Sequence, residues 1–416
     1  MAPPVAPPRH RALALFVLLA MACASSPDAP DAAQLDAAQP DAAQPDTAQP
    51  DAARPDDVDR PVDVAPVDAA EATLRARVLA RAEAFVGNGT VEIAPTGTPE
   101  PAPQLPTLVF GVVSDELTEV FTLARDDEGA PPRARSVYPI SSISKLVTGL
   151  IAARGVVAGD FTADTRAREL LAPDLASAVG DRTVLELVTH TAGYNPNPMN
   201  WTGPPESPAA GYSRAQLAAC LAIPACSTAR AVRGRYLYSN LSVGILGLAL
   251  ADRYATTFEQ LVTERLTRDL GMLDTHTRAL ADEARFVGGH TLQGAAVSPA
   301  TMGALASAGE LLSTGEDMQR LTAALVSPPS ALAPAVTLAA TPSTASAQVG
   351  FAIDVISRRG LDLRAKSGEQ AGYSSMVMWC PAMRAGAFAL ANLGHSSKTL
   401  AALLIELHVM LRDARR

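Results

Sequence analysis

A serine and a lysine, Ser142 and Lys145, stand three residues apart at the start of an apolar, helix-like stretch. Residues at this spacing share one face of a helix, so the lysine amine could reach the serine hydroxyl. A serine beside a base is the arrangement of an activated nucleophile. The alternative is a helix-capping serine followed by a solvated lysine, and the spacing taken alone favours this alternative.

Lysine is rare in this chain, which makes each lysine informative. Of 34 lysines and arginines, only Lys145, Lys366 and Lys398 are lysines. Arginine does not lose its proton in proteins, whereas a buried lysine can be brought toward neutrality. A retained lysine therefore suits a site that needs a proton acceptor.

Two later stretches carry side chains that such a site could use. Tyr238-Ser-Asn240 precedes an apolar helix-like run, and Lys366-Ser-Gly368 follows a short strand-like run. A phenol beside two ammonium groups should have a lowered pKa, and burial with mutual repulsion should lower the pKa of both lysines. Taken singly, each stretch has a structural alternative: a buried tyrosine with a helix-capping asparagine, or a sheet-edge lysine followed by a turn.

The elements that would position these residues follow from the spacing of apolar side chains. Expected strands cover 107–113 and 119–123, which form a hairpin, and later 349–355, 362–365, 373–379 and 387–391. Expected helices cover 71–85, a mainly helical region from 142 to about 325 that includes 184–188, 241–250 and 304–323, and finally 397–411. Strands at both ends with helices between them predict an α+β fold. We expect an antiparallel sheet flanked by helices, a mainly helical insertion over about 158–340, and the site at their junction.

The first 70 residues differ in composition from the rest. Basic residues near position 10 precede an apolar run over 12–22 that is too short to span a bilayer, a pattern typical of a secretory signal. Residues 24–70 repeat Asp-Ala-Ala-Gln-Pro with variations, and such acidic, proline-rich sequence without aromatic residues cannot form a core. We therefore expect a signal peptide over 1–22, a disordered tether over 23–70 and one folded domain over 71–416.

Charge and motif spacing argue against several classes of protein. The formal net charge is −9, partly from the acidic repeat, and it indicates no nucleic-acid partner. His190 and His290 lack neighbours at the spacing of zinc ligands, so no metal and no cofactor are expected. The Gly-x-Ser-x-Gly nucleophile elbow of α/β-hydrolases is absent.

Taken together, the three motifs Ser142-x-x-Lys145, Tyr238-x-Asn240 and Lys366-Ser-Gly368 occur in the order of the penicillin-recognising serine enzymes. The chain resembles their class C branch over about 71–416. That branch contains class C β-lactamases, D-alanyl-D-alanine carboxypeptidases and endopeptidases, and esterases of the same fold. Further stretches of the resemblance are 187–193, 270–275, 308–314 with Asp317, and 389–392.

The resemblance implies a role for the residues of the first two motifs. Ser142 would be the acylated nucleophile, and Lys145 and Tyr238 would move protons during acylation and deacylation. Which of Lys145 and Tyr238 accepts the first proton stays open. Asn240 would bind the amide of the substrate.

The third motif would bind and polarise the substrate. Lys366 and Ser367, next to Gly368, would engage a substrate carboxylate, and the backbone N–H groups of Ser142 and Glu369 would form an oxyanion hole. The family usually has a small residue where this chain has Glu369. That acid could weaken carboxylate binding or attract a cationic substrate group.

We therefore expect a serine acyl-transfer hydrolase. The ammonium of Lys366 favours a DD-carboxypeptidase or endopeptidase acting on peptidoglycan peptides that end in a free carboxylate. The alternatives are a class C-like β-lactamase, which differs in the rate of deacylation, a carboxylesterase of the same fold, and a non-catalytic penicillin-binding lipoprotein.

The cysteines bear on localisation. Cys23 follows Leu19-Ala-Met-Ala22, which resembles a bacterial lipobox, although ordinary signal cleavage after Ala22 is the alternative. We expect a monomer that crosses the inner membrane, faces the periplasm and touches the membrane through its lipid anchor only. In that oxidising compartment Cys220 and Cys226 would form a disulfide, the alternative being two buried thiols.

Overall fold

A computed structural model of the chain describes residues 69–95, 98–125, 132–204, 207–228, 230–277, 283–343 and 348–416. All of them belong to the second of two units of the chain, Val67–Arg416. The expected signal peptide, Cys23 and nearly all of the expected tether lie outside the described residues. No helix in the described ranges combines the length and apolar character that a membrane crossing requires.

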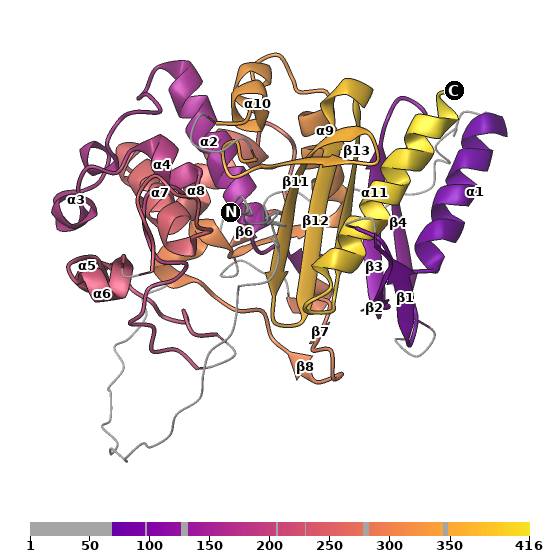
Figure 1. Ribbon diagram of the computed structural model, residues 1–416, viewed down its shortest axis with the longest axis horizontal. Helices are drawn as coiled ribbons and strands as arrows, with labels where there is room; N and C mark the ends of the chain where they lie inside the picture. The colour runs from indigo at the N-terminus through magenta and orange to yellow at the C-terminus, as the bar shows by residue number, and fades with distance from the viewer. Residues whose placement is uncertain are drawn as a thin grey trace, which may run out of the picture. The chain divides into compact units, whose positions relative to one another are not determined.

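A six-stranded antiparallel sheet forms the centre of this unit (Figure 1). In spatial order its strands are β10 (Asp354–Arg358), β11 (Leu361–Gln370), β12 (Tyr373–Cys380), β13 (Ala385–Ala391), β3 (Thr107–Val113) and β4 (Thr118–Ala124). The hairpin β3–β4 comes early in the chain, and it joins the sheet because β3 pairs with β13, the last strand of the chain. The α+β fold expected from the sequence is confirmed.

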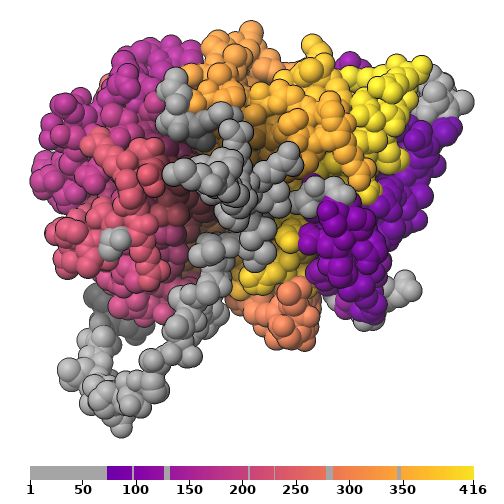
Figure 2. Space-filling model, viewed as in Figure 1, coloured from indigo at the N-terminus to yellow at the C-terminus, as the bar shows by residue number. Residues whose placement is uncertain are grey.

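Helices cover both faces of the sheet. On one face lie α1 (Ala69–Glu83) and α11 (Ser397–Ala414), which pack against each other (Figure 1). In Figure 2 the atoms of these terminal segments, indigo and yellow, adjoin. On the other face lie α2 (Ile143–Ala158) and α9 (Gly315–Val326).

Side-chain alternation along β13 explains these two layers. Phe388 and Leu390 belong to the core shared with α2 and α9, whereas Ala387 and Ala389 belong to the core beneath α11. Successive residues of a strand point to opposite faces, so a run that is apolar throughout buries both. All seven residues of β13 are buried.

The segment between β5 (Val137–Pro139) and β10 forms a mainly helical part, which Figure 1 shows in magenta to orange. Besides α2 and α9 it contains α3 (Pro173–Val179), α4 (Val184–Val188), α5 (Arg214–Leu221), α6 (Pro224–Ser227), α7 (Asn240–Arg253), α8 (Phe258–Val262) and α10 (Ala333–Ala340). Thr183, Ser213 and Thr257 each begin a helix with a capping box, in which side chain and backbone satisfy one another. Cys220 and Cys226 form a disulfide between α5 and α6, and Cys380 is a buried free thiol.

Short elements complete this unit. They are the strands β1 (Thr90–Ile93), β2 (Glu100–Pro103), β6 (His276–Thr277), β7 (Gly289–His290), β8 (Ala296–Val297) and β9 (Leu311–Thr314), the 3₁₀ turns η2 (Ala167–Glu169), η5 (Glu283–Arg285), η6 (Gly303–Ala308) and η7 (Pro381–Met383), and the π turn η3 (Thr263–Thr267). The strands β5, β9 and β6 form a small sheet of their own.

Two expected elements differ from the structure. The expected helix over 304–323 begins only at Gly315, because the preceding residues form the 3₁₀ turn η6 and then the buried strand β9. A short, fully buried run has no polar alternation that would identify it as a strand. The expected strand over 349–355 is also wrong, since β10 begins at Asp354 after a buried turn in which Ala352 has φ 57°.

Candidate active site

Ser142 lies at the N-terminal end of α2, after a turn in which Ser141 adopts a left-handed backbone with φ 48°. Its side chain makes no capping hydrogen bond to the helix. The Ser142 Oγ lies 2.9 Å from Lys145 Nζ and 2.7 Å from the Tyr238 hydroxyl oxygen. The geometry therefore differs from the alternative of a capping serine with a solvated lysine.

Lys145 is completely buried on the first turn of α2. Its ammonium donates to Ser142 Oγ and to the backbone carbonyl of Ala308, in η6. Burial lowers the pKa of Lys145, and the positive charge of Lys366 lowers it further, while the Tyr238 phenol acts in the opposite direction. Lys145 is thus a lysine that can give up its proton more readily than a free one.

Tyr238 lies in the segment before α7, between the two lysines. Its ring centroid is 4.9 Å from Lys145 Nζ and 5.0 Å from Lys366 Nζ. Burial on its own would raise the pKa of this phenol, but the two positive charges and the hydrogen bonds with Lys145 and Ser142 lower it below 10.0. The lowered pKa that the sequence predicted for Tyr238 agrees with this geometry.

Asn240 is the first residue of α7, yet it does not cap the helix. Ser239 takes that role, since its Oγ accepts a hydrogen bond from the Ser242 backbone N–H at 2.9 Å. The Asn240 amide donates to Asn197 Oδ1 at 2.7 Å. An amide nitrogen carries two N–H groups, so one donor remains for another partner.

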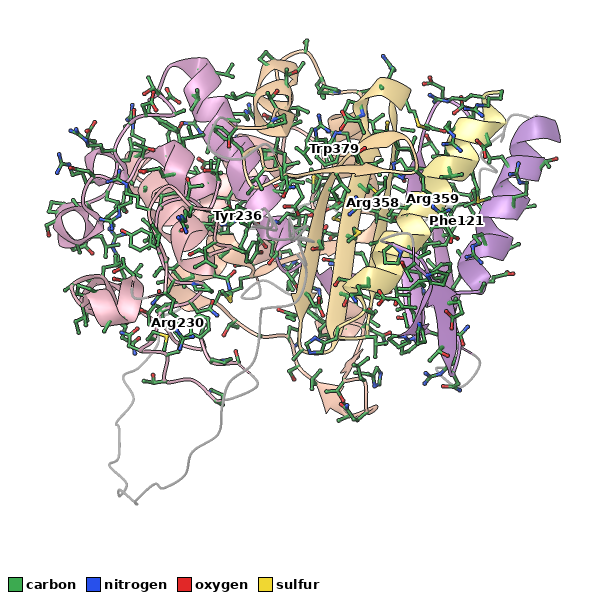
Figure 3. The ribbon with its side chains drawn as sticks, viewed as in Figure 1. Phe121, Arg230, Tyr236, Arg358, Arg359 and Trp379 are labelled. Carbon is green, nitrogen blue, oxygen red and sulfur yellow. A yellow bond between two sulfur atoms is a disulfide. The ribbon has the colours of Figure 1, made fainter. Side chains whose placement is uncertain are left out.

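Lys366 lies on β11 and is 2% exposed, with its Nζ 3.5 Å from Asp354 Oδ2 on the neighbouring strand. Burial opposes the charge, but the Asp354 carboxylate and the phenols of Tyr238 and Tyr236 raise the pKa of Lys366 above its ordinary value. Figure 3 labels Tyr236 within the helical part. The expectation of a lowered pKa is therefore correct for Lys145 and wrong for Lys366.

Asp354 is a residue of the site that the sequence interpretation missed. The expected strand over 349–355 placed this acid inside a strand of unknown partner. In the structure β10 pairs with β11 with Asp354 opposite Ala365, which brings its carboxylate beside the next residue, Lys366. Only knowledge of the strand pairing could have identified it, because the two residues are twelve positions apart.

Gly368 allows β11 to approach the backbone of the candidate nucleophile. A side chain at this position would place its Cβ 2.2 Å from the Ile140 carbonyl oxygen and 3.0 Å from the Ser142 backbone nitrogen. Real Cβ atoms essentially never show a contact of 2.2 Å, so a side chain here would force the backbone to shift. The structure thus brings the third motif directly against the first.

Glu369 points away from Lys366. Its carboxylate accepts a hydrogen bond from Ser397 Oγ at 2.8 Å and lies 3.0 Å from His395 Nδ1, near the start of α11. Alternation along β11 places Ser367 on the same face as Glu369 and opposite to Lys366. The acid that offsets the charge of Lys366 is therefore Asp354 rather than Glu369.

His190 supports the segment that carries Tyr238. Its Nδ1 accepts the Ser239 backbone N–H at 3.2 Å, its carbonyl accepts the Leu237 N–H at 2.9 Å, and its ring centroid is 4.7 Å from that of Tyr238. Burial and the charges of the two lysines lower the pKa of His190 well below its ordinary value, so it is neutral. Across the described ranges, no three His, Cys, Asp or Glu side chains gather as metal ligands would.

Comparisons with known proteins agree with this fold. The family model described as Beta-lactamase matches residues 67–409. A class C beta-lactamase structure superposes with a TM-score of 0.67 at 17% identity, over 83% of this chain and 99% of that one. A beta-lactamase from Sulfitobacter sp. EE-36 superposes with a TM-score of 0.61 at 19% identity, over 83% of this chain and 99% of that one. The octameric penicillin-binding protein homologue from Pyrococcus abyssi superposes with a TM-score of 0.61 at 15% identity, over 82% of this chain and 77% of that one.

No curated protein matches the sequence. The structural likenesses, all at low identity, concern the fold, whereas the family model spans most of the chain. The resemblance stated from the three motifs is confirmed. This chain therefore belongs to the beta-lactamase family of serine hydrolases.

Proposed function

We propose that the protein is a serine acyl-transfer hydrolase that works through a covalent acyl-enzyme on Ser142. The observation that carries the proposal is the pair of proton acceptors at the serine: Lys145 Nζ at 2.9 Å and the Tyr238 hydroxyl at 2.7 Å. The pKa of both groups is lowered from its ordinary value. Each is thus suited to take the hydroxyl proton as the oxygen attacks a carbonyl carbon.

Each step of the proposed reaction would involve groups that neighbour Ser142. Attack by Ser142 Oγ would give a tetrahedral intermediate, whose oxyanion the backbone N–H groups of Ser142 and Glu369 would stabilise. Collapse would expel the leaving group, which takes the proton held by Lys145 or Tyr238. A water activated by the same groups would then hydrolyse the acyl-enzyme, while Asn240 holds the substrate amide.

The substrate that the sequence favours is a peptidoglycan peptide ending in D-alanyl-D-alanine, which would make the protein a DD-carboxypeptidase or endopeptidase. The reason for this preference is the ammonium of Lys366, since a charge-assisted hydrogen bond suits a free carboxylate. β-Lactams and short esters would use the same acylation chemistry. The ion pair of Lys366 with Asp354 weakens the preference, because the charge already has a partner.

The experiment treats the full-length protein in parallel with labelled penicillin, nitrocefin, a D-Ala-D-Ala peptide and a p-nitrophenyl ester. Intact mass should show an acyl adduct with at least one of them, and Ser142→Ala should abolish it. Ser141→Ala is the matched control, because the Ser141 hydroxyl has no hydrogen-bond partner among the described residues. An adduct that survives Ser142→Ala, or that both variants lose, would contradict the proposal.

A further inference from the structure

We propose that Asp354 determines substrate specificity: its carboxylate occupies the ammonium of Lys366 and thereby favours acyl donors that lack a carboxylate in the leaving group. The inference rests on the proposed acyl-transfer function of the same site, but it runs against the preference for peptidoglycan peptides, because the D-alanine that leaves such a peptide carries a carboxylate. It assigns a role to an acid that lies outside the three sequence motifs.

The geometry of the pair places the acid on the more exposed side. The side chain of Lys366 is 3% exposed, whereas that of Asp354 is 34% exposed, and their charged atoms are 3.5 Å apart. A substrate carboxylate that approached the ammonium from solvent would therefore meet a fixed negative charge. Two carboxylates around one ammonium repel each other, so binding the second is disfavoured.

Asp354 is held in place by the turn that precedes it. Residues 351–353 are buried in the core of the helical part. The Phe351 N–H donates to the Ala339 carbonyl at 2.9 Å, and the Ala352 N–H donates to the Val188 carbonyl at 3.0 Å. With β10 also paired to β11, the backbone of Asp354 is fixed beside the strand that carries Lys366.

Two other charged groups, Glu369 and Lys145, do not bind or repel a substrate carboxylate in place of this pair. Glu369 is engaged by Ser397 and His395 on the opposite face of the strand. Lys145, the other ammonium beside Tyr238, has a lowered pKa and is a proton acceptor in the proposed function. Selection for or against a substrate carboxylate therefore depends on the Lys366–Asp354 pair.

The test uses two esters that share one acyl group and differ by one charge. They are the phenylacetylglycyl ester of meta-hydroxybenzoate, whose leaving group carries a carboxylate, and that of methyl meta-hydroxybenzoate, whose leaving group is neutral. Both form the same acyl-enzyme, so the ratio of their kcat/KM values reports acylation alone. The ratio is measured on the full-length protein at one low ionic strength, since salt screens exposed charges.

The wild-type protein should show a ratio, anionic to neutral, at or below about one. Asp354→Asn should raise it on the order of 10-fold, because removal of the acid frees a charge-assisted hydrogen bond for the substrate. Asp362→Asn is the matched control, because it also replaces one aspartate carboxylate by an amide, at an exposed residue of β11 that pairs with Arg364. This variant should leave the ratio unchanged. The double variant Asp354→Asn/Lys366→Ala should show no gain.

Three outcomes would overturn the inference: a ratio that Asp354→Asn leaves unchanged or lowers, a gain that persists without Lys366, or an equal gain in Asp362→Asn. If Asp354→Asn does not fold, Asp354→Ser is measured instead. If neither variant turns over the neutral ester while Asp362→Asn does, Asp354 is a structural residue and the inference is wrong. Failure of the proposed function looks different, since the wild-type protein would then form no Ser142-dependent adduct with either ester.

Discussion

At Ser142, the candidate nucleophile, two groups are placed to accept one proton. Lys145 has a lowered pKa chiefly because it is buried, whereas Tyr238 has one because positive charges outweigh its burial. Their coupling is direct, since loss of a proton from either group changes the charge that acts on the other: Lys145 loses a positive charge, whereas Tyr238 gains a negative one. Substitution of the lysine separates the two, because arginine keeps the charge and cannot act as a base.

Lys145→Arg should therefore lower the acylation rate by about 10²-fold or more, the usual contribution of a general base. If the neutral amine of Lys145 is the base in the wild-type protein, the rate should rise with pH through a pKa below 10.5. The arginine variant should lose this rising limb. The measurement is the rate of adduct formation against pH, by intact mass.

The control for this variant is Lys398→Arg, which makes the same change at the lysine that pairs with Glu100 at 3.1 Å. It should leave the rate and its pH dependence unchanged. A Lys145→Arg protein that keeps the rising limb would assign the first proton transfer to Tyr238 instead.

At this scale the sequence predicted the identities of the residues better than their electrostatics. Ser142, Lys145 and Tyr238 follow from motif order, and the structure brings all three within hydrogen-bond distance. The raised pKa of Lys366 could not be predicted, because its cause, Asp354, comes from a neighbouring strand. A pKa depends on every charge nearby, and a single sequence does not show which strands pair.

At the scale of elements, the site depends on how closely β11 approaches the turn before α2. Ser375 Oγ on β12 donates to the Ile140 carbonyl at 2.8 Å, and the Ile140 N–H donates to the Leu311 carbonyl at 2.9 Å. The turn is thus held between the main sheet and β9. Gly368 faces the same Ile140 carbonyl without a side chain between them.

Gly368→Ala should push β11 and this turn apart, since the new Cβ would lie 2.2 Å from the Ile140 oxygen. Overpacking of this kind costs about 1–3 kcal/mol of stability, and a displacement near 1 Å at a reacting centre can cost on the order of 10²-fold in rate. We expect a folded protein with a lower melting temperature and an acylation rate reduced by about that factor.

Gly288→Ala is the control, because a Cβ there meets no atom within 4 Å. It should change neither the melting temperature nor the acylation rate. Unimpaired acylation in Gly368→Ala would show that the close approach of β11 is not needed for the chemistry.

The elements themselves were predictable where their pattern was unambiguous. The strands β12 and β13 and the helix α11 lie where the apolar spacing put them, within a few residues. The strand β9 was not predicted because it lies in a fully buried run. The start of β10 was misplaced because a buried turn precedes it. Burial on all sides removes the periodic signal on which such predictions depend.

For the whole molecule, the N-terminal segment bears on where the folded unit works. Cys23 and the acidic repeat lie outside the described residues, so localisation remains a prediction from the sequence. A repeat of roughly 47 residues at ~3 Å per extended residue could reach up to ~150 Å, enough to hold an enzyme well away from a membrane. That reach is useful only if the chain is anchored at one end.

Cys23→Ser tests the anchor, because only the thiol can carry the lipid. The wild-type protein should fractionate with membranes and carry lipid mass, and the variant should appear as a soluble periplasmic protein with unchanged specific activity, since the site lies in the separate unit Val67–Arg416. Cys380→Ser makes the same substitution at the buried free thiol and should stay with the membranes. Recovery of the wild-type protein in the soluble fraction without lipid would instead indicate ordinary cleavage after Ala22, and the repeat would then need a role other than a tether.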